Sequence, residues 1–284
     1  MDDIKSDLNS LENRFLLKTT RYSGHATKIA EIYADSYDVI ISVGGDGTLN
    51  EIINGLAPEK EKEIGVLPLG SGNDFFINLS NVKSSKVSLN DLIYSESLIS
   101  DADIGIVQYK EPGSEEIITR KFINALGVGF DALVAHYNQQ GKFFQGIGSY
   151  FTAIFKSIVS YKALKIYGDL DNIDFSGDNL MLTVGNGKSS GGGFKLNPNA
   201  VINDGFLDLT KVDYLNRKRI FSALPLAVKG DIHKVPEAEM YQFKSAEFNL
   251  KNPYYLHTDG EVLSNIAEWI KIDVQKTKLN FISI

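Results

Sequence analysis

The stretch of sequence that decides the fold is Val39-Ile40-Ile41-Ser42-Val43-Gly44-Gly45-Asp46-Gly47-Thr48-Leu49-Asn50-Glu51. An apolar run rich in β-branched side chains comes before the glycines, and apolar residues from Leu49 to Leu56 follow at helical spacing. This order predicts a strand, a tight loop and a helix. Glycines let backbone N–H groups approach a phosphate closely, and the helix directs its positive end to the same point. The pattern therefore predicts a phosphate-binding loop, with a plain strand-to-helix turn as the alternative.

Two polar side chains of this loop suit a nucleotide site, and a second glycine loop follows. The Asp46 carboxylate is a hard oxygen ligand of the kind that Mg²⁺ prefers, and Thr48 either caps the helix or contacts a phosphate. A short apolar strand at 64–69 runs into Gly70-Ser71-Gly72-Asn73-Asp74-Phe75 and another helix pattern. Because strands alternate with helices, we expect a parallel sheet with both loops at the carboxyl ends of its strands, where open α/β sheets bind ligands.

From about residue 98 the pattern changes to strands with few helices between them. The candidate strands are 98–109, 117–127, 163–169, 179–185, 206–213, 239–250, 254–258 and 267–274, interrupted by helical segments at about 130–162 and 216–232. Runs of strands favour an antiparallel β-sandwich. We therefore predict a doubly wound α/β nucleotide-binding domain over residues 1–97, opening with a helix at 3–13 and a short strand at 15–18, and a β-sandwich domain over 98–276.

The composition excludes several classes of protein. The 284 residues carry a formal net charge of −7 and no cysteine, so disulfides and cysteine-based metal sites are excluded and a dedicated nucleic-acid binder is disfavoured. The four histidines lie far apart, without metal-ligand spacing. The first residues are polar, and no apolar run reaches about 18 residues. We therefore expect a soluble cytoplasmic protein without a membrane span.

Glycine-rich turns recur in the second half of the chain. A strand runs into a helix through Gly127 and Gly129, and a long glycine-rich loop leads to an acidic turn around Asp204. An Asp among backbone carbonyls fits a Mg²⁺ or Ca²⁺ site, and it equally fits an Asx-turn. Asp259-Gly260-Glu261 lies between two predicted strands. Asp-Gly is a hairpin signal in itself, so a type I′ turn and a catalytic role both stay open.

In this order the motifs resemble the diacylglycerol kinase catalytic family, and most of all the soluble bacterial lipid kinases. The resemblance covers nearly the whole chain and rests on Gly44 to Glu51, Gly70 to Phe75, Asn124 to Ala132, Gly191 to Asp208 and Asp259 to Glu261. It implies that a C-terminal strand at 277–284 returns to the first domain. The family opens with a strand and an Asn-Pro-x-Ser-Gly loop, which this sequence lacks because its first proline is Pro58. We therefore expect the natural start to lie upstream.

The resemblance implies an ATP-dependent lipid kinase that uses Mg²⁺ and transfers the γ-phosphate to a lipid hydroxyl, converting diacylglycerol to phosphatidic acid. A kinase for a sphingoid base or a polyprenol is one alternative, and a catalytically silent nucleotide- or lipid-binding protein is another. The residues that the resemblance assigns to the nucleotide are Thr20, Gly44, Gly45, Asp46, Gly47, Thr48, Asn50, Glu51, Ser71 and Asn73.

The resemblance also assigns catalytic roles to acidic residues. Asp259 or Glu261 is the base that takes the proton from the lipid hydroxyl, and Asp46 acts through Mg²⁺ on the triphosphate. Phosphoryl transfer depends mainly on positioning and charge neutralisation, so a carboxylate base with Mg²⁺ suffices. Asp74 and Asp103 fall where relatives have active-site acids.

A structural metal site is implied at the acidic turn. Some bacterial relatives hold a Mg²⁺ there, which maps to Asp204 with the backbone carbonyls of Val201 and Phe206. Relatives carry a second acid at the position of Asn203, and its loss here weakens the expected affinity for the metal.

Two segments are candidates for membrane contact, because a lipid kinase takes its substrate from a bilayer. The aromatic segment 143–156 either lies at a membrane interface or forms core. The basic cluster Arg217-Lys218-Arg219 fits anionic lipid or a solvated helix start. We expect a cytoplasmic protein that associates transiently with a peripheral membrane surface and has no nucleic-acid partner, and a homodimer stays open.

Overall fold

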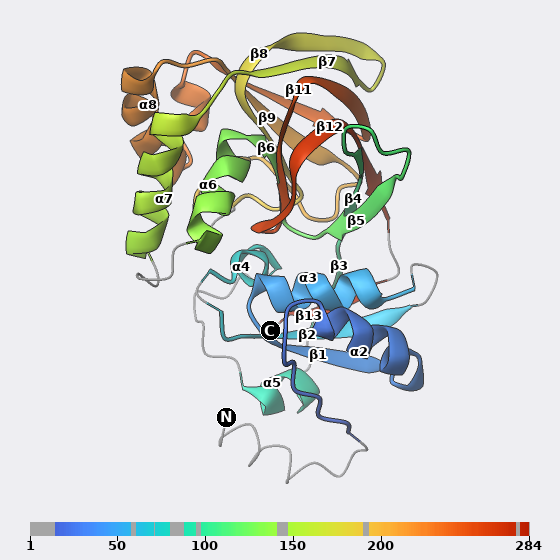
Figure 1. Ribbon diagram of the computed structural model, residues 1–284. Coiled ribbons are helices and arrows are strands. Elements are labelled where there is room, and N and C mark those ends of the chain that lie inside the picture. The colour runs from blue at the N-terminus through green and yellow to red at the C-terminus, as the bar shows by residue number, and fades with distance from the viewer. Residues whose placement is uncertain are drawn as a thin grey trace. The chain divides into compact units, whose positions relative to one another are not determined.

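The computed structural model describes residues 15–57, 61–70, 72–79, 88–94, 98–140, 147–189, 193–276 and 279–283. The chain divides into two compact units (Figure 1). Unit 1 comprises Met1–Ala102 and Thr277–Ile284, and unit 2 comprises Asp103–Lys276. The predicted fold class is confirmed, since unit 1 is α/β and unit 2 is rich in antiparallel strands. The helix predicted at 3–13 lies outside the described residues.

Unit 1 is built on a four-stranded sheet. Its strands, in spatial order, are β1 (Val39–Gly44), β2 (Lys62–Pro68), β13 (Leu279–Ser283) and β3 (Leu98–Asp101). The first three run parallel, and β3 runs antiparallel to β13. The strand predicted at 98–109 is therefore two strands that belong to different sheets. It breaks at Asp103, whose backbone N–H leaves the strand direction and donates to the Ile202 carbonyl at 2.7 Å.

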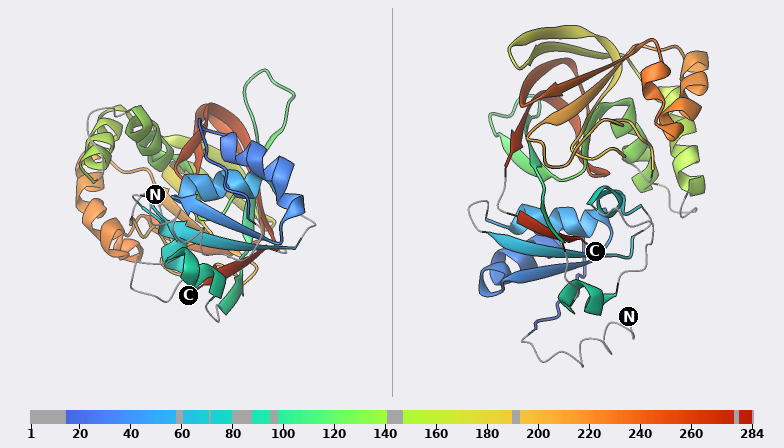
Figure 2. Two further views of the ribbon diagram at one scale, coloured as in Figure 1. Left: turned by 90° about the horizontal axis from the view of Figure 1, so that it is seen from below. Right: turned by 180° about the vertical axis from the view of Figure 1, so that it is seen from behind.

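Helices cover both faces of this sheet. The helices of unit 1 are α2 (His25–Tyr33), the short 3₁₀ turn η1 (Ala34–Ser36), α3 (Asp46–Gly55), α4 (Asp74–Leu79) and α5 (Leu89–Tyr94). Figure 2 shows α2 and α3 on one face and α5 on the other. The core between them includes the Phe75 and Phe281 rings, whose centroids lie 4.9 Å apart. The segment 15–18, predicted as a strand, is exposed coil.

Unit 2 contains one large antiparallel sheet. Its strands are β4 (Ile104–Lys110), β5 (Ile118–Phe122), β6 (Ala125–Gly129), β7 (Leu164–Leu170), β8 (Ile173–Gly185), β9 (Leu207–Asp213), β10 (Ala238–Phe243), β11 (Ser245–Thr258) and β12 (Glu261–Gln275). The order is β10-β9-β8-β6-β11-β12-β4-β5, and β7 pairs with both β8 and β11. Because β6 joins β8 to β11 at one end and β7 joins them at the other, these four strands form a closed ring around an apolar core.

Three helices gather at one side of the strands of unit 2 (Figure 1). They are α6 (Phe130–Gln140), α7 (Ile147–Ser160) and α8 (Arg217–Lys229), followed by the 3₁₀ turn η2 (Ile232–Lys234). A second apolar core lies between these helices and β8. The segment predicted as helical at 130–162 is thus two helices. No helix among the described residues is long and apolar enough to cross a membrane.

Candidate active site

The two glycine loops of unit 1 are in direct backbone contact. The first loop joins β1 to α3, and the second joins β2 to α4. A Cβ atom on Gly70 would lie 2.4 Å from the Cα of Gly45, so neither position has room for a side chain. The Leu69 N–H donates to the Gly44 carbonyl at 2.9 Å. The strands thus bring both predicted phosphate-contacting loops to one edge of the sheet.

Asp46 fixes the second loop. Its two carboxylate oxygens accept hydrogen bonds from the backbone N–H groups of Asp74 and Phe75, each at 3.0 Å. Asn73 adopts a left-handed backbone with φ of 54°, and its side-chain amide both accepts from and donates to the Gly70 backbone. Each Asp46 oxygen keeps acceptor capacity beyond one N–H bond.

Glu51 supports the loop that opens α2. Its carboxylate accepts from the N–H groups of Gly24 at 2.8 Å and Ala26 at 2.9 Å. His25 accepts a bond from the Arg21 N–H at 3.1 Å in the same loop. Thr20, which lies at the start of this segment, is exposed. Glu51 is therefore placed to orient the loop that carries Thr20, and a direct nucleotide contact by either residue stays a prediction.

The remaining predicted nucleotide residues differ in exposure. A Cβ on Gly47 would meet no atom within 4 Å, so this backbone is open to an approaching group. The Thr48 side chain packs over Gly44. Asn50 is buried, and its side-chain oxygen accepts from the Asn54 amide at 3.0 Å, which favours a structural role for it. Ser71 lies outside the described residues.

Asp259, Gly260 and Glu261 form the tight turn between β11 and β12 in unit 2. Asp259 and Gly260 have φ values of 48° and 82°, which fits the left-handed pair of a type I′ turn. The Asp259 carboxylate accepts three backbone hydrogen bonds, from Ile123 at 2.9 Å, Asn124 at 2.9 Å and Ala125 at 2.8 Å. These bonds fix the orientation of Asp259 against the junction of β5 and β6.

Glu261 has a different environment from Asp259. It is the first residue of β12 and is exposed. Its carboxylate makes no hydrogen bond or ion pair with any residue that the structure describes. On the far side of the turn, the Gln139 amide of α6 donates to the Gly260 carbonyl at 3.1 Å. Of the two candidate bases, Asp259 uses its carboxylate oxygens to accept backbone hydrogen bonds. The Glu261 carboxylate is exposed and is therefore the better placed to accept a proton.

A buried amide network holds this region in place. The Asn186 side chain donates to the carbonyls of Asp103 and Ile123, each at 2.8 Å. The Asn124 side chain donates to the Ser189 carbonyl at 2.6 Å. Sequence reasoning did not select Asn186 or Asn124 as functional. For Asn186 the available signal was its position between Gly185 and Gly187, because glycines in or beside strands often mark close backbone approach.

The acidic turn before β9 is well bonded within the chain. Asp204 accepts from the Phe206 N–H at 3.0 Å and from the Gln242 amide at 3.3 Å, and Asp103 accepts from the Gly205 N–H at 2.6 Å. Burial raises the pKa of Asp208 to about 6, a Gln242 hydrogen bond lowers it, and the charge of Asp204 raises it.

The expected metal site at this turn is not preformed as a cluster of side chains. Among the described residues, no group of three or more His, Asp and Glu side chains could hold a metal ion. Asp204 and Phe206 lie together in the Asx-turn that was the alternative interpretation of this sequence. Metal binding by Val201, Asp204 and Phe206 stays a prediction.

A further polar cluster lies at the start of α6. The Asp131 carboxylate accepts from the Thr183 hydroxyl at 2.5 Å and lies 3.7 Å from His257 Nε2. A Cβ on Gly127 would lie 2.1 Å from Asp131 Oδ2 and 2.3 Å from His257 Nε2. The glycine on β6 therefore provides the space for the cluster. Sequence analysis did not identify this cluster, because its members come from three separate strands and helices.

Comparison with known proteins agrees with this arrangement. Residues 1–107 match the diacylglycerol kinase catalytic domain, and residues 124–280 match the YegS C-terminal NAD kinase beta sandwich-like domain. The diacylglycerol kinase of Staphylococcus saprophyticus is 30% identical over 246 residues, which cover 86% of this chain and 76% of that protein. That of Staphylococcus aureus strain RF122 is 30% identical over 246 residues, covering 85% and 74%.

The fold is also similar to that of a solved structure. The crystal structure of a putative diacylglycerol kinase from Bacillus anthracis superposes with a TM-score of 0.71 at 24% identity, over 93% of this chain and 83% of that one. At this identity the likeness shows the fold alone. The family is shown by the two family matches and by the Staphylococcus relatives. The chain belongs to the diacylglycerol kinase family and is a kinase, an enzyme that transfers phosphate.

Proposed function

We propose that this protein is an ATP-dependent lipid kinase that phosphorylates diacylglycerol to phosphatidic acid. The observation that carries the proposal is the difference between the two carboxylates of the turn between β11 and β12. Asp259 is fixed by three backbone N–H groups, and Glu261 beside it is exposed and has no partner among the described residues. The Staphylococcus relatives are named diacylglycerol kinases, which supports diacylglycerol as the acceptor here.

In the proposed reaction Glu261 is the general base. The lipid hydroxyl oxygen bonds to the γ-phosphorus of ATP while the bond from that phosphorus to the β,γ-bridging oxygen breaks. ADP leaves, and the hydroxyl proton passes to Glu261. The backbone N–H groups of the Gly44 to Thr48 loop donate to the phosphates, since the open backbone at Gly47 admits them.

The Asp46 carboxylate fits a magnesium ion that is bound together with the nucleotide. Mg²⁺ is usually held by one or two carboxylates and by substrate phosphates rather than by a full protein cage. Asp46 has a fixed orientation and spare acceptor capacity, as its hydrogen bonds to α4 show. When bound, the ion neutralises charge on the triphosphate.

The test is transfer of radiolabelled phosphate from ATP to diacylglycerol in mixed micelles. Wild type is compared with Glu261→Gln and with Glu268→Gln, a control on the same strand, β12. We expect transfer by wild type and by the control, and a loss of about 100-fold or more in Glu261→Gln, the usual contribution of a general base. Equal rates for all three proteins would refute the assignment of Glu261.

We further propose that α7 contacts the membrane surface. One face of this helix is buried through Ala153, Ile154 and Ile158. The opposite face exposes Phe151 by 57%, Phe155 by 60% and Val159 by 55%, at a spacing of four residues. The buried face forms core, and the exposed apolar face supports the proposed contact with a membrane surface. Residues 143–146 of the predicted segment lie outside the described residues.

The basic cluster is less suited to lipid than the α7 stripe. Arg217 donates to the carbonyls of Ile158 and Val159 at the end of α7, and Arg219 forms an ion pair with Glu237 at 2.8 Å. Of the three basic residues, only Lys218 lacks such a bond within the described chain. Flotation with anionic vesicles tests the proposal: Phe151→Ser with Phe155→Ser should lose binding, while Ile173→Ser, an exposed apolar control on β8, should keep it.

A further inference from the structure

Gly260 is the least constrained residue of the turn that carries the proposed base. Before it, the Asp259 carboxylate is fixed by three backbone N–H groups, and around it Thr258 pairs with Glu261 across the two strands. Gly260 itself has a φ of 82°, and a Cβ atom there would meet no atom within 4 Å. A glycine in open surroundings has a wide choice of backbone angles. The direction of the Glu261 side chain therefore depends on what holds the peptide group between Gly260 and Glu261.

A side chain from α6 holds this peptide group. The Gln139 amide donates to the Gly260 carbonyl at 3.1 Å, and that carbonyl accepts no other hydrogen bond from any residue that the structure describes. The Gly260 carbonyl and the Glu261 N–H belong to one planar unit, because the peptide bond does not rotate freely. A hydrogen bond to that oxygen therefore restricts the backbone at the residue that carries the base.

Helix α6 is in turn held against β11, the strand that leads into the turn. In its first turn, the Asp131 carboxylate lies 3.7 Å from His257 Nε2. Nearer its end, the His136 ring lies against the Tyr255 ring, with 4.7 Å between the two centroids. His136 precedes Gln139 by about one helical turn, so both residues lie on the same side of α6. The end of the helix that carries Gln139 is therefore attached to β11.

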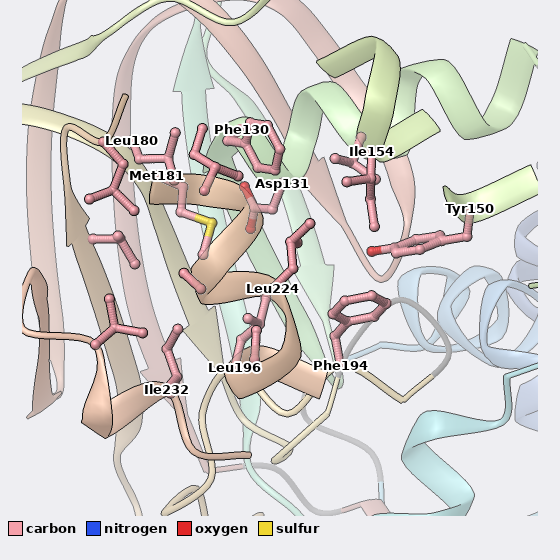
Figure 3. Close-up of a pocket in the computed structure, with 17 residues that line it drawn as sticks. Phe130, Asp131, Tyr150, Ile154, Leu180, Met181, Phe194, Leu196, Leu224 and Ile232 are labelled. Atoms are coloured by element: carbon pink, nitrogen blue, oxygen red, sulfur yellow. The ribbon is translucent and has the colours of Figure 1, made fainter. Parts of the chain in front are cut away.

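The same helix is also anchored in the second apolar core of unit 2. Figure 3 shows Phe130 of α6 between Met181 of β8 and Ile154 of α7, and all three side chains are buried in this core. Farther along α6, the Tyr137 hydroxyl donates to the Ser160 hydroxyl of α7 at 3.0 Å. A side chain positions a reacting group well only when its own support is rigid. The contacts of α6 provide such a support.

We propose that Gln139 is a positioning residue for phosphate transfer, because its bond to the Gly260 carbonyl directs the Glu261 carboxylate toward the acceptor hydroxyl. This inference rests on the proposed function and adds a residue that acts only through Glu261. In the transfer step the hydroxyl oxygen bonds to the γ-phosphorus, the bond to the β,γ-bridging oxygen breaks and ADP leaves. The hydroxyl proton passes to Glu261, and Gln139 stays bonded to Gly260 throughout.

The first test removes the donor. Gln139→Met keeps the length and the helix propensity of the side chain but cannot donate to Gly260. Its kcat should fall about 3- to 10-fold, the effect of one neutral hydrogen bond, with an unchanged KM for ATP and an unchanged Tm. The control is Gln140→Met, an equally exposed neighbour whose amide lies 2.9 Å from His136 Nε2 within α6. The control should keep the kcat of wild type.

The second test asks whether Gln139 acts through the base. Gln139→Met is combined with Glu261→Gln, and phosphate transfer by the double variant is compared with that of Glu261→Gln alone. A residue that only positions Glu261 has nothing left to position in that background, so the two rates should be equal. The same proportional fall in both backgrounds would show that Gln139 acts independently of Glu261, which overturns the inference.

The remaining outcomes separate this inference from the proposed function. Equal kcat values for wild type and Gln139→Met overturn the inference and leave the kinase in place, as does an equal fall in Gln140→Met. Full activity of Glu261→Gln refutes the base and the inference with it. If wild type transfers phosphate to no lipid, the proposed function fails, and amide hydrogen exchange in the turn decides whether Gln139 holds it. Faster exchange in Gln139→Met than in wild type upholds that contact, and equal exchange overturns it.

Discussion

Replacing Asp259 by asparagine separates the structural role of this residue from catalysis. Asparagine tolerates the left-handed backbone of position 259, so the turn itself is kept. The side-chain oxygen can still accept from Asn124 and Ala125, but an amide nitrogen now faces the Ile123 N–H. Losing one hydrogen bond to a charged group and leaving that N–H unsatisfied costs about 3 kcal/mol of the free energy of unfolding.

The single tryptophan of the chain provides the assay for this change. Trp269 lies on β12 in unit 2, where its indole donates to Glu247 at 2.9 Å, so its fluorescence reports the unfolding of this unit. With a guanidinium dependence of about 4 kcal/mol per molar, a loss of about 3 kcal/mol lowers the unfolding midpoint by about 0.7 M.

Glu261→Gln is the matched variant, because its side chain is exposed and bonds to no described residue. Its free energy of unfolding should stay within about 0.5 kcal/mol of wild type, although its kinase activity falls. Asp259→Asn, by contrast, should clearly lower the free energy of unfolding. The assigned roles would be wrong if Asp259→Asn unfolded at the same midpoint as wild type. They would also be wrong if Glu261→Gln lowered the midpoint as far as Asp259→Asn does.

Three other perturbations have defined outcomes. Gly70→Ala should lower Tm by about 5 °C or more through its clash with Gly45, whereas Gly47→Ala should leave Tm unchanged or raised; a stable Gly70→Ala would contradict the loop contact. Glu51→Gln should raise the KM for ATP several-fold with little change in kcat, because it loosens the loop before α2; an unchanged KM would show that this loop does not bear on the nucleotide. If a structural Mg²⁺ binds at the acidic turn, its addition should raise the Tm of wild type but not of Asp204→Asn, as thermal unfolding without nucleotide would show; equal shifts would exclude that site.

The local elements of the fold were predictable because their signals are local. The β-branched run before Gly44 and the helical spacing after it placed β1 and α3 correctly. The break between β3 and β4 has a local signal, the polar residues Ser100, Asp101 and Asp103, but the prediction of one strand over 98–109 passed over it. At the break, Asp103 donates one hydrogen bond to Ile202 and accepts another from Gly205, about a hundred residues away in sequence. Contacts between residues so far apart do not change the hydrophobic periodicity of the sequence.

The roles of residues in the candidate site were also not fully predictable from the sequence. The motifs selected both Asp259 and Glu261, but their sequence could not say which one is free. That difference is set by three backbone N–H groups at 123–125, which a distant turn brings to Asp259. The cluster of Asp131 and His257 was missed for the same reason, because neither residue is unusual until β6 and β11 pair side by side.

The place of β13 in the sheet of unit 1 has a consequence for synthesis on the ribosome. β13 lies between β2 and β3, and β3 has no other strand neighbour in the described sheet. Residues 103–276 must be translated before β13 exists, which takes about 10 to 35 s at bacterial and eukaryotic elongation rates. During that interval β2 and β3 expose backbone that only the last strand can pair, while unit 2 already has all its strands. All strands of unit 2 are therefore translated before the last strand of unit 1, so the sheet of unit 1 is the last to be completed.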